Sequence, residues 1–267
     1  MVQAMNTAKS PESGATSGST FFGGRTVPVG EKQGLVRDVF RSVAGRYDLM
    51  NDLMSGGVHR LWKARMVDWL NPRGPMAIVD VAGGTGDIAF RLLKRLNQSA
   101  RGRDTGTITV CDLTEDMVRV GRDRATDRSI VRGIEWVTGD AECLPLADES
   151  QDAYTIAFGI RNVTDLGAAL AEARRVLRWG GRFMCLEFSS PVMPGLDWAY
   201  QAYSATLPWL GRAVTGDGDA YRYLVESIAR FPNRDDFSER IEAAGFSQVT
   251  ARPLSGGIAA LHSAWRT

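Results

Sequence analysis

A glycine-dense turn follows a short apolar run in the stretch Ala77–Asp87, AIVDVAGGTGD. Because glycine has no Cβ atom, the backbone N–H groups of such a turn and the N-terminus of the helix after it can approach a ligand closely. The segment Gly84-Thr85-Gly86, with Ala89 three residues later, fits the dinucleotide pattern G-x-G-x-x-G/A. Asp112 stands where a ribose-binding acid would follow. The turn predicts a nucleoside or dinucleotide site, and the pattern alone leaves NAD open.

Carboxylates in or after three apolar runs favour a cationic, hydroxyl-rich ligand over a pyrophosphate. Asp80 lies inside the first run, and Asp112 and Asp140 follow the next two. An unpaired acid inside a strand is costly unless it bonds to the turn or to a ligand. S-adenosylmethionine (SAM) has the matching groups, because it carries a sulfonium, an amine, a ribose diol and an adenine but no phosphate. SAM is therefore the expected ligand.

Each polar residue of this site has an expected contact with SAM. Asp112 accepts hydrogen bonds from both ribose hydroxyls, Asp140 and the backbone of Ala141 face the adenine, and the backbone of Gly83–Gly86 passes close to the methionine part. The structural alternatives are a helix N-cap for Asp112 and a turn residue for Asp140. Both alternatives stay open at this point.

Alternating strand and helix patterns place these residues. Alternation of this kind predicts parallel strands with right-handed crossovers, and hence a doubly wound α/β sheet. A strand pair follows a short helix that ends at Gly245, an expected C-cap, and Thr164 or Asp165 is the expected N-cap of an earlier helix. The expected strands are Ala77–Ala82, Thr107–Cys111, Ile134–Thr138, Ala153–Phe158, Arg182–Phe188, Phe246–Arg252 and Ile258–Trp265, and the expected helices are Asp87–Leu96, Glu115–Ala125, Leu166–Leu177 and Asp235–Ala244.

Three segments lie outside this alternation. Residues 1–31 are expected to form an unstructured tail, because their first part is rich in Ser, Gly, Thr and Ala. Residues 32–267 are expected to form one domain, with an N-terminal helical cap at 32–72 and a helical, aromatic insertion at 191–234. Tyr47 of the cap can project into the site, and packing of the cap against the main body is the equal alternative.

Composition excludes several classes of function. Lys and Arg number 32 against 31 acids, so a net charge of +1 gives no electrostatic case for nucleic acid. Only two histidines are present, which argues against a multi-histidine metal site, and no metal is expected. No apolar run is long enough to span a bilayer, which predicts a soluble protein. The three cysteines are scattered with no CxxC spacing, which favours reduced thiols and a cytoplasmic location.

Longer motifs give the sequence a more specific resemblance, to the UbiE/COQ5 (MenG) family of SAM-dependent C-methyltransferases of ubiquinone and menaquinone biosynthesis. The resemblance runs from about Lys32 to the C-terminus. It implies a class I, Rossmann-like methyltransferase fold, with a mostly parallel seven-stranded sheet and an insertion after the fifth strand. The matching segments are Phe40–Ala44, Tyr47-Asp48, Met50–Ser55, His59–Lys63, Ala82–Asp87, Phe158–Asp165, Leu186–Ser189, Tyr221–Leu224, Glu226–Ile228 and Ala260–His262.

The resemblance also implies which residues contact SAM. The contacts fall on Thr85, Asp112, Asp140 and Ala141. A further contact, which is often made by a serine in the family, falls on Ala157 here. The missing hydroxyl removes at most one hydrogen bond, worth about 1 kcal/mol, which does not disable the site. With Asp80, Gly84 and Gly86, which the turn itself points to, these residues complete the expected cofactor site.

The implied substrate is a polyprenylated benzoquinol or a demethylmenaquinol, methylated on a ring carbon. Arg161, Asn162 and Tyr47 are the candidate catalytic residues. Arginine keeps its proton, so Arg161 is expected to stabilise the developing phenolate or orient a water, while Asn162 fixes the ring. The alternative for Arg161 is a structural ion pair beneath the site.

Other functions and partners remain open. A non-catalytic SAM-binding subunit of a quinone-biosynthesis complex is the alternative from a different class, and a nucleic-acid methyltransferase or an NAD-binding oxidoreductase are further ones. The prenyl tail needs an apolar path, since each buried CH₂ contributes about 0.8 kcal/mol. The segment Met193–Trp209 is the candidate for that path or for transient contact with the inner face of a membrane. A homodimer is a further expectation.

Overall fold

The computed structural model describes residues 18–44, 47–100, 104–189 and 218–267, together with residues 203, 206, 207, 209 and 212. Of residues 47 and 48 it describes the backbone alone. Among these residues, no helix is both long and apolar enough to cross a membrane. Most of the segment Met193–Trp209, the expected aromatic path, lies outside the described residues. The side chain of Tyr47 lies outside them as well.

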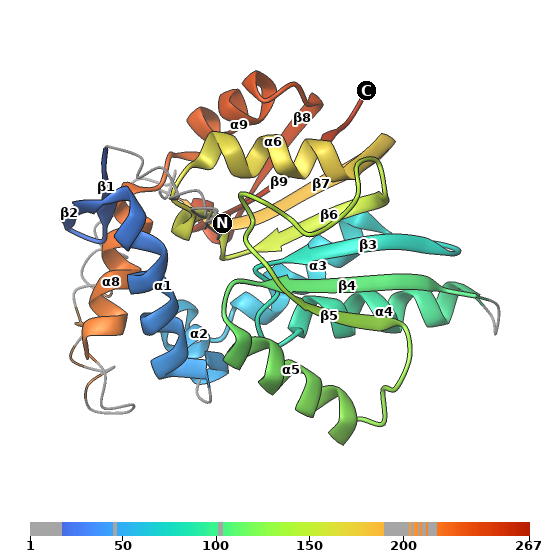
Figure 1. The fold of residues 1–267 in the computed structure, drawn as a ribbon, viewed down its shortest axis with the longest axis horizontal. Coiled ribbons are helices and arrows are strands. Elements are labelled where there is room, and N and C mark those ends of the chain that lie inside the picture. Colours follow the sequence, from blue (N-terminus) through green and yellow to red (C-terminus); the bar gives the residue numbers. More distant parts are fainter. Residues whose placement is uncertain are drawn as a thin grey trace, which may run out of the picture.

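A seven-stranded sheet forms the centre of the fold (Figure 1). Its strand order is β5-β4-β3-β6-β7-β9-β8, and β9 is antiparallel to both of its neighbours. The order reverses between β3 and β6, so the crevice at their carboxyl ends is the expected ligand position. The strands are β3 Met76–Val81, β4 Gly106–Asp112, β5 Ile134–Thr138, β6 Gln151–Ala157, β7 Leu177–Phe188, β8 Ser247–Leu254 and β9 Ala259–Trp265.

Helices cover both faces of the sheet, as the predicted doubly wound topology requires (Figure 1). Ile78 and Val79 are neighbours in β3, yet Ile78 packs into one hydrophobic core and Val79 into the other. This follows from the alternation of side chains along a strand, and it explains why β3 is apolar throughout except at Asp80. The helices around the sheet are α3 His59–Leu70, α4 Asp87–Ala100, α5 Glu115–Asp127, α6 Leu166–Val176 and α9 Arg234–Ala243.

The sequence-based elements are confirmed, with small shifts at their ends. Asp165 is the N-cap of α6, where its Oδ1 accepts hydrogen bonds from the N–H groups of Gly167 and Ala168. The largest shift is at β7, which begins at Leu177 rather than Arg182. Leu177 pairs with Gln151 of β6 before a register shift, so strand pairing starts as soon as α6 ends.

The N-terminal segment differs from the sequence-based expectation. Residues 18–31 were expected in an unstructured tail, but they form a hairpin and the first turn of a helix. The hairpin consists of β1 Ser19–Phe22 and β2 Arg25–Pro28, and α1 Val29–Val43 and α2 Tyr47–Ser55 follow.

The hairpin is held by α8 Gly218–Arg230, which lies beside it in Figure 1. The rings of Phe22 and Tyr223 stack with centroids 4.3 Å apart. The N–H of Gly24 donates to Oε2 of Glu226 over 2.6 Å. These partners are about 200 positions apart in the chain, so composition near the N-terminus could not reveal them.

Candidate functional site

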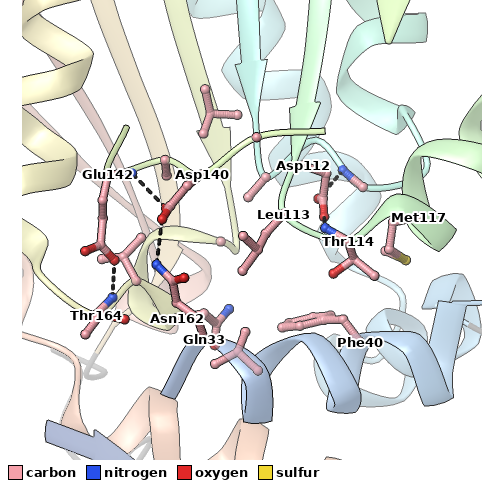
Figure 2. Close-up of a pocket in the computed structure, with 18 of the residues that line it drawn as sticks. Gln33, Phe40, Asp112, Leu113, Thr114, Met117, Asp140, Glu142, Asn162 and Thr164 are labelled. Carbon is pink, nitrogen blue, oxygen red and sulfur yellow. Dashed lines mark hydrogen bonds between the residues drawn. The ribbon is translucent and has the colours of Figure 1, made fainter. Parts of the chain in front are cut away.

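A pocket opens where the parallel strands end, under the N-terminal helix α1 (Figure 2). Carboxylates from the ends of two neighbouring strands line one side, and apolar side chains of α1 line another. The pocket therefore combines a few polar groups with an apolar wall, the arrangement that binds a nucleoside.

Asp112, the last residue of β4, is fixed by backbone donors. Its Oδ2 accepts from the N–H of Gly84 over 2.9 Å, and its Oδ1 accepts from the N–H of Thr114 over 2.9 Å. Burial raises the pKa of Asp112 to about 6, although these two hydrogen bonds act in the opposite direction. The carboxylate thus couples the glycine turn after β3 to the loop after β4, and it lines the pocket with a fixed orientation.

Asp140, just after β5, also lines the pocket and receives a hydrogen bond from the N-terminal cap. Its Oδ1 accepts from the N–H of Glu142 over 2.9 Å, as in the turn that was the structural alternative. Its Oδ2 accepts from Nε2 of Gln33 over 2.5 Å. Asp140 therefore shapes the turn and at the same time holds α1 over the pocket. Ala141 lines the same wall.

Residues of α1 and of the loop after β4 complete the apolar wall. Val36, Phe40, Leu113 and Met117 line the pocket, and Figure 2 shows Phe40 across from Leu113 and Met117. Sequence reasoning assigned none of them to the site. Phe40 carried a signal, because it belongs to a segment of the family resemblance; Leu113 carried one as well, because it follows the strand-ending Asp112 directly.

Lys32, in the first turn of α1, and Glu142, just after β5, both bind the loop after β6 and were also missed. Oε1 of Glu142 accepts from the N–H of Thr164 over 2.5 Å. Nζ of Lys32 donates to the carbonyl of Val163 over 2.7 Å. Burial lowers the pKa of Lys32, and the charge of Glu142 acts against this shift. The Lys32 contact joins the cap to the loop that carries Asn162, and the Glu142 contact joins the segment after β5 to the same loop.

The glycine turn lies between this pocket and a second, smaller cavity. Gly84 lines the larger pocket, Thr85 lines the smaller one, and Ala82 lines both. Gly86 has φ +84°, and a Cβ built there would lie 2.5 Å from the indole of Trp136. Only glycine fits at that position, which explains the third glycine of the turn.

Asp80 lies in the wall of the smaller cavity and is almost fully buried. Its Oδ1 accepts from Oγ1 of Thr155 over 2.8 Å. Burial raises the pKa of Asp80 to about 7, while the Thr155 hydroxyl and the charge of Lys63 act against the shift. Of the expected cofactor residues, some line the larger pocket (Gly84, Asp112, Asp140 and Ala141) and some the smaller cavity (Asp80 and Thr85), whereas Gly86 lines neither.

Arg161 and Asn162, in a short 3-10 turn after β6, have different surroundings. Asn162 lines the larger pocket, and its Oδ1 accepts from the hydroxyl of Tyr223 over 2.9 Å. Nη1 of Arg161 lies 2.6 Å from Oε1 of Glu187 and 2.7 Å from the carbonyl of Phe158. Arg161 does not line the larger pocket, so its contacts match the structural alternative raised from the sequence. Tyr223 was missed, and Tyr47 cannot be placed because its side chain lies outside the described residues.

The sequence and fold match known methyltransferases. The model of the ubiE/COQ5 methyltransferase family matches residues 27–266. A Bradyrhizobium protein named "Ubiquinone/menaquinone biosynthesis C-methyltransferase UbiE" is 56% identical over 255 residues, 94% of this chain and 98% of its own length. A Methylobacterium nodulans protein of the same name is 58% identical over 251 residues, 93% of this chain and 97% of its own length.

Solved structures support the fold. A SAM-dependent methyltransferase of Thermotoga maritima superposes with a TM-score of 0.59 at 20% identity, over 86% of this chain and 99% of its own. A SAM-dependent methyltransferase from Aquifex aeolicus superposes with a TM-score of 0.57 at 14% identity, over 82% of this chain and 97% of its own. At these identities the likeness concerns the fold.

Proposed function

The chain belongs to the ubiE/COQ5 methyltransferase family, and on that premise we propose how its pocket carries out SAM-dependent C-methylation in quinone biosynthesis. The activity itself follows from the family and from relatives of that name along nearly the whole chain. The roles of individual residues are the proposal.

The larger pocket holds the adenosine part of SAM. The observation that carries this assignment is the pair of carboxylates, Asp112 and Asp140, at the ends of neighbouring strands in one pocket. Asp112 accepts hydrogen bonds from the ribose hydroxyls, since a carboxylate oxygen can accept more than one hydrogen bond and each has a single described donor. Asp140 and the backbone of Ala141 face the adenine, and Phe40 packs against it.

The residues present fit SAM better than a dinucleotide. A pyrophosphate would meet the negative charges of Asp112 and Asp140 without a described cation in the wall of the larger pocket. SAM supplies an electrophilic methyl group on its sulfonium, to which a nucleophilic ring carbon of the quinol bonds. The protein contributes by orientation and by exclusion of water, because a phenolate and a sulfonium give two neutral products.

Asn162 binds the quinol ring at the open side of the pocket. Because Tyr223 donates to its Oδ1, the amide N–H₂ of Asn162 remains available as a donor to a ring oxygen. Arg161 acts through its neighbours: its hydrogen bond to the Phe158 carbonyl and its ion pair with Glu187 fix the turn that presents Asn162. We place Arg161 as a positioning residue rather than a proton acceptor.

The proposal also includes contacts with the prenyl tail of the substrate and with a membrane surface. The substrate carries a polyprenyl chain, and the segment around Trp209 contacts that chain or the membrane surface. In support, Trp209 is 70% exposed, which is unusual for a tryptophan outside an interaction surface. With no spanning helix among the described residues, such contact would be peripheral.

Calorimetry with S-adenosylhomocysteine and a methyl-transfer assay test the proposal together. The purified protein should bind S-adenosylhomocysteine and should methylate a short-tailed demethylated quinol. Asp112→Asn should weaken binding at least tenfold, because it replaces a charged acceptor of the ribose hydroxyls. Binding without methyl transfer would support the non-catalytic subunit instead, and unchanged affinity in Asp112→Asn would remove Asp112 from the site.

A further inference from the structure

A groove beside the turn after β6 is lined by basic side chains, and the described residues of its wall include no carboxylate. The wall is formed by the N-terminal hairpin, the first turn of α1, the turn after β6, α8 and α9. Its basic residues are Lys32, Arg161, Arg230 and Arg240, and we call this space the basic groove. Because the whole chain carries a net charge of only +1, so uneven a wall calls for an explanation.

Lys32 is buried in this wall without an anionic partner. Only 8% of the residue is exposed, and its Nζ donates to the carbonyl of Val163 over 2.7 Å. Burial lowers the pKa of Lys32. The charge of Glu142 acts against this shift from the larger pocket, but Glu142 forms no hydrogen bond with Nζ among the described contacts. A buried ammonium group next to a neutral carbonyl is costly, and an anion in the groove would offset that cost.

Two arginines at the ends of different helices line the same groove. Arg230 lies in the last turn of α8, and Arg240 lies in the last turn of α9. The guanidinium of Arg230 lies over the ring of Phe21, 4.3 Å from its centroid, which holds it beside the hairpin. Neither arginine forms an ion pair with a carboxylate in the part of the chain that the structure describes. The helix dipole favours a cation in each last turn, but it does not explain why both cations line one groove with Lys32.

The charge of the basic groove selects the class of ligand. Arg161 adds no net charge, because it is paired with the buried carboxylate of Glu187. Lys32, Arg230 and Arg240 remain without a compensating acid in the wall. A phosphate monoester carries about two negative charges near neutral pH, and a diphosphate carries more. Guanidinium groups bind phosphate oxygens in pairs of hydrogen bonds, and a lysine adds a point charge, so this set of side chains fits such a ligand.

The burial of Lys32 favours a small soluble ligand over a lipid headgroup. A phosphate in the surface of a bilayer is reached by exposed side chains, and a phosphodiester has a single negative charge. A small molecule can enter the groove and reach a buried ammonium group. The groove also lies apart from the site of the proposed methyl transfer, because Lys32, Arg230 and Arg240 do not line the larger pocket.

We propose that the basic groove binds the phosphate group of a small soluble ligand, a phosphate monoester or a diphosphate, between Lys32 of α1, Arg230 of α8 and Arg240 of α9. A bound phosphate joins the first turn of the N-terminal helix to two later helices. This inference goes beyond the proposed function and does not depend on it.

Calorimetry with inorganic pyrophosphate, on the full-length protein without SAM, is the first test. Sodium chloride keeps the ionic strength constant, so that only specific binding gives a saturable heat. Pyrophosphate should bind saturably, with one site per chain. A heat that does not saturate, or that sodium chloride reproduces at equal ionic strength, would overturn the proposal.

Charge-removing variants locate the site. Arg230→Gln and Arg240→Gln should each bind pyrophosphate at least fivefold more weakly, and Lys32→Met at least tenfold more weakly. Arg222→Gln is the matched control, because Arg222 lies on α8 outside the groove and is paired with Asp219. It removes the same charge and should stay within twofold of the unmodified protein. An equal loss in Arg222→Gln would show general attraction to a basic surface, and it would refute the site.

Vesicles distinguish a soluble ligand from a lipid headgroup. Sedimentation compares phosphatidylglycerol vesicles with phosphatidylcholine vesicles for the unmodified protein and for Arg240→Gln. The two proteins should sediment to the same extent, since the basic groove is not a lipid site. If pyrophosphate does not bind while phosphatidylglycerol vesicles retain the unmodified protein and release Arg240→Gln, the groove takes a lipid headgroup and the proposal is wrong.

Discussion

The guanidinium of Arg161 forms an ion pair with the carboxylate of Glu187, with 2.6 Å between Nη1 and Oε1. Both side chains are almost fully buried, at 4% and 1% exposure. Arg161 also lies over the ring of Phe188, 5.6 Å from its centroid. The pair joins the turn after β6 to the end of β7. Asn162 directly follows Arg161 in this turn. The stability of this turn and the role proposed for Asn162 are thereby coupled.

Arg161→Ala should destabilise the protein by about 3–5 kcal/mol, because it leaves the Glu187 carboxylate buried without its partner. Urea unfolding followed by circular dichroism measures the loss. Arg161→Met combined with Glu187→Gln is the matched control, and it should recover most of the stability because no lone charge remains. A single variant as stable as the unmodified protein would show that the pair is not formed.

The same double variant, Arg161→Met with Glu187→Gln, tests whether Arg161 positions Asn162 for catalysis or only supports the fold. If Arg161 positions Asn162, this folded variant should turn over the quinol at least tenfold more slowly while its affinity for S-adenosylhomocysteine stays within threefold. Steady-state kinetics and calorimetry give the two numbers. Equal losses in both would reduce the pair to a scaffold element.

Tyr223→Phe should lower turnover and leave S-adenosylhomocysteine binding unchanged, because only the hydroxyl that orients Asn162 is lost. Stability should fall by about 1 kcal/mol. Tyr154→Phe is the control, since the Tyr154 hydroxyl is buried without a partner among the described residues and its removal should cost nothing. A Tyr223→Phe enzyme with full turnover would show that Asn162 needs no such orientation.

Gln33→Leu and Phe40→Ala should each weaken S-adenosylhomocysteine binding, chiefly by faster dissociation, because α1 covers the pocket through these side chains. We expect a three- to tenfold loss for Gln33→Leu and a larger one for Phe40→Ala, which also removes apolar contact area. Stopped-flow displacement measures the rates. Arg37→Ala, on the exposed side of α1, should behave like the unmodified protein; dissociation rates that do not change in any variant would exclude α1 as a cover.

The ligand-free protein should lose stability as the pH rises through the folded-state pKa of Asp80. Burial raises the pKa of Asp80 to about 7 from the ordinary value of about 4. The folded state therefore favours the protonated acid, so this contribution is complete below about pH 4 and is lost as the pH passes 7. Three pH units correspond to about 4 kcal/mol.

Asp80→Asn isolates this contribution, because the other buried acids, such as Asp112 and Glu187, are common to both proteins. The free energy of unfolding of Asp80→Asn, minus that of the unmodified protein, should increase by up to about 4 kcal/mol between pH 4 and pH 8. Unfolding curves at four pH values give the difference. A difference that stays flat or decreases would contradict a raised pKa at Asp80.

The sequence alone was sufficient for the sheet and the glycine turn, because their signals are local. The turn Gly83–Gly86 and the acids Asp80 and Asp112 are close in sequence to the strands that place them. The apolar runs fixed strand positions to within a few residues, and β5 was predicted at its observed bounds. Right-handed crossovers then brought the strand ends together.

The rest depended on contacts between distant segments. Gln33 reaches Asp140 across 107 positions, and Tyr223 reaches Asn162 across 61. The helical cap itself was expected, but no periodicity encodes such pairs, which is why the contacts of α1 with the pocket and the role of Tyr223 were missed and why residues 18–31 were assigned to a tail. The burial of Lys63 also depends on contacts between separate elements. Its helix was expected, but its position beside Asp87 follows only from the packing of α3 against α4.

The hairpin at the N-terminus is docked on α8 through Gly24 and Glu226, which are 202 positions apart. During translation, the hairpin leaves the ribosome long before its docking surface exists. A nascent chain can complete the strands β3 to β7 while the hairpin is still undocked. Docking of the hairpin therefore belongs to the last stage of synthesis, when most of the sheet has already emerged.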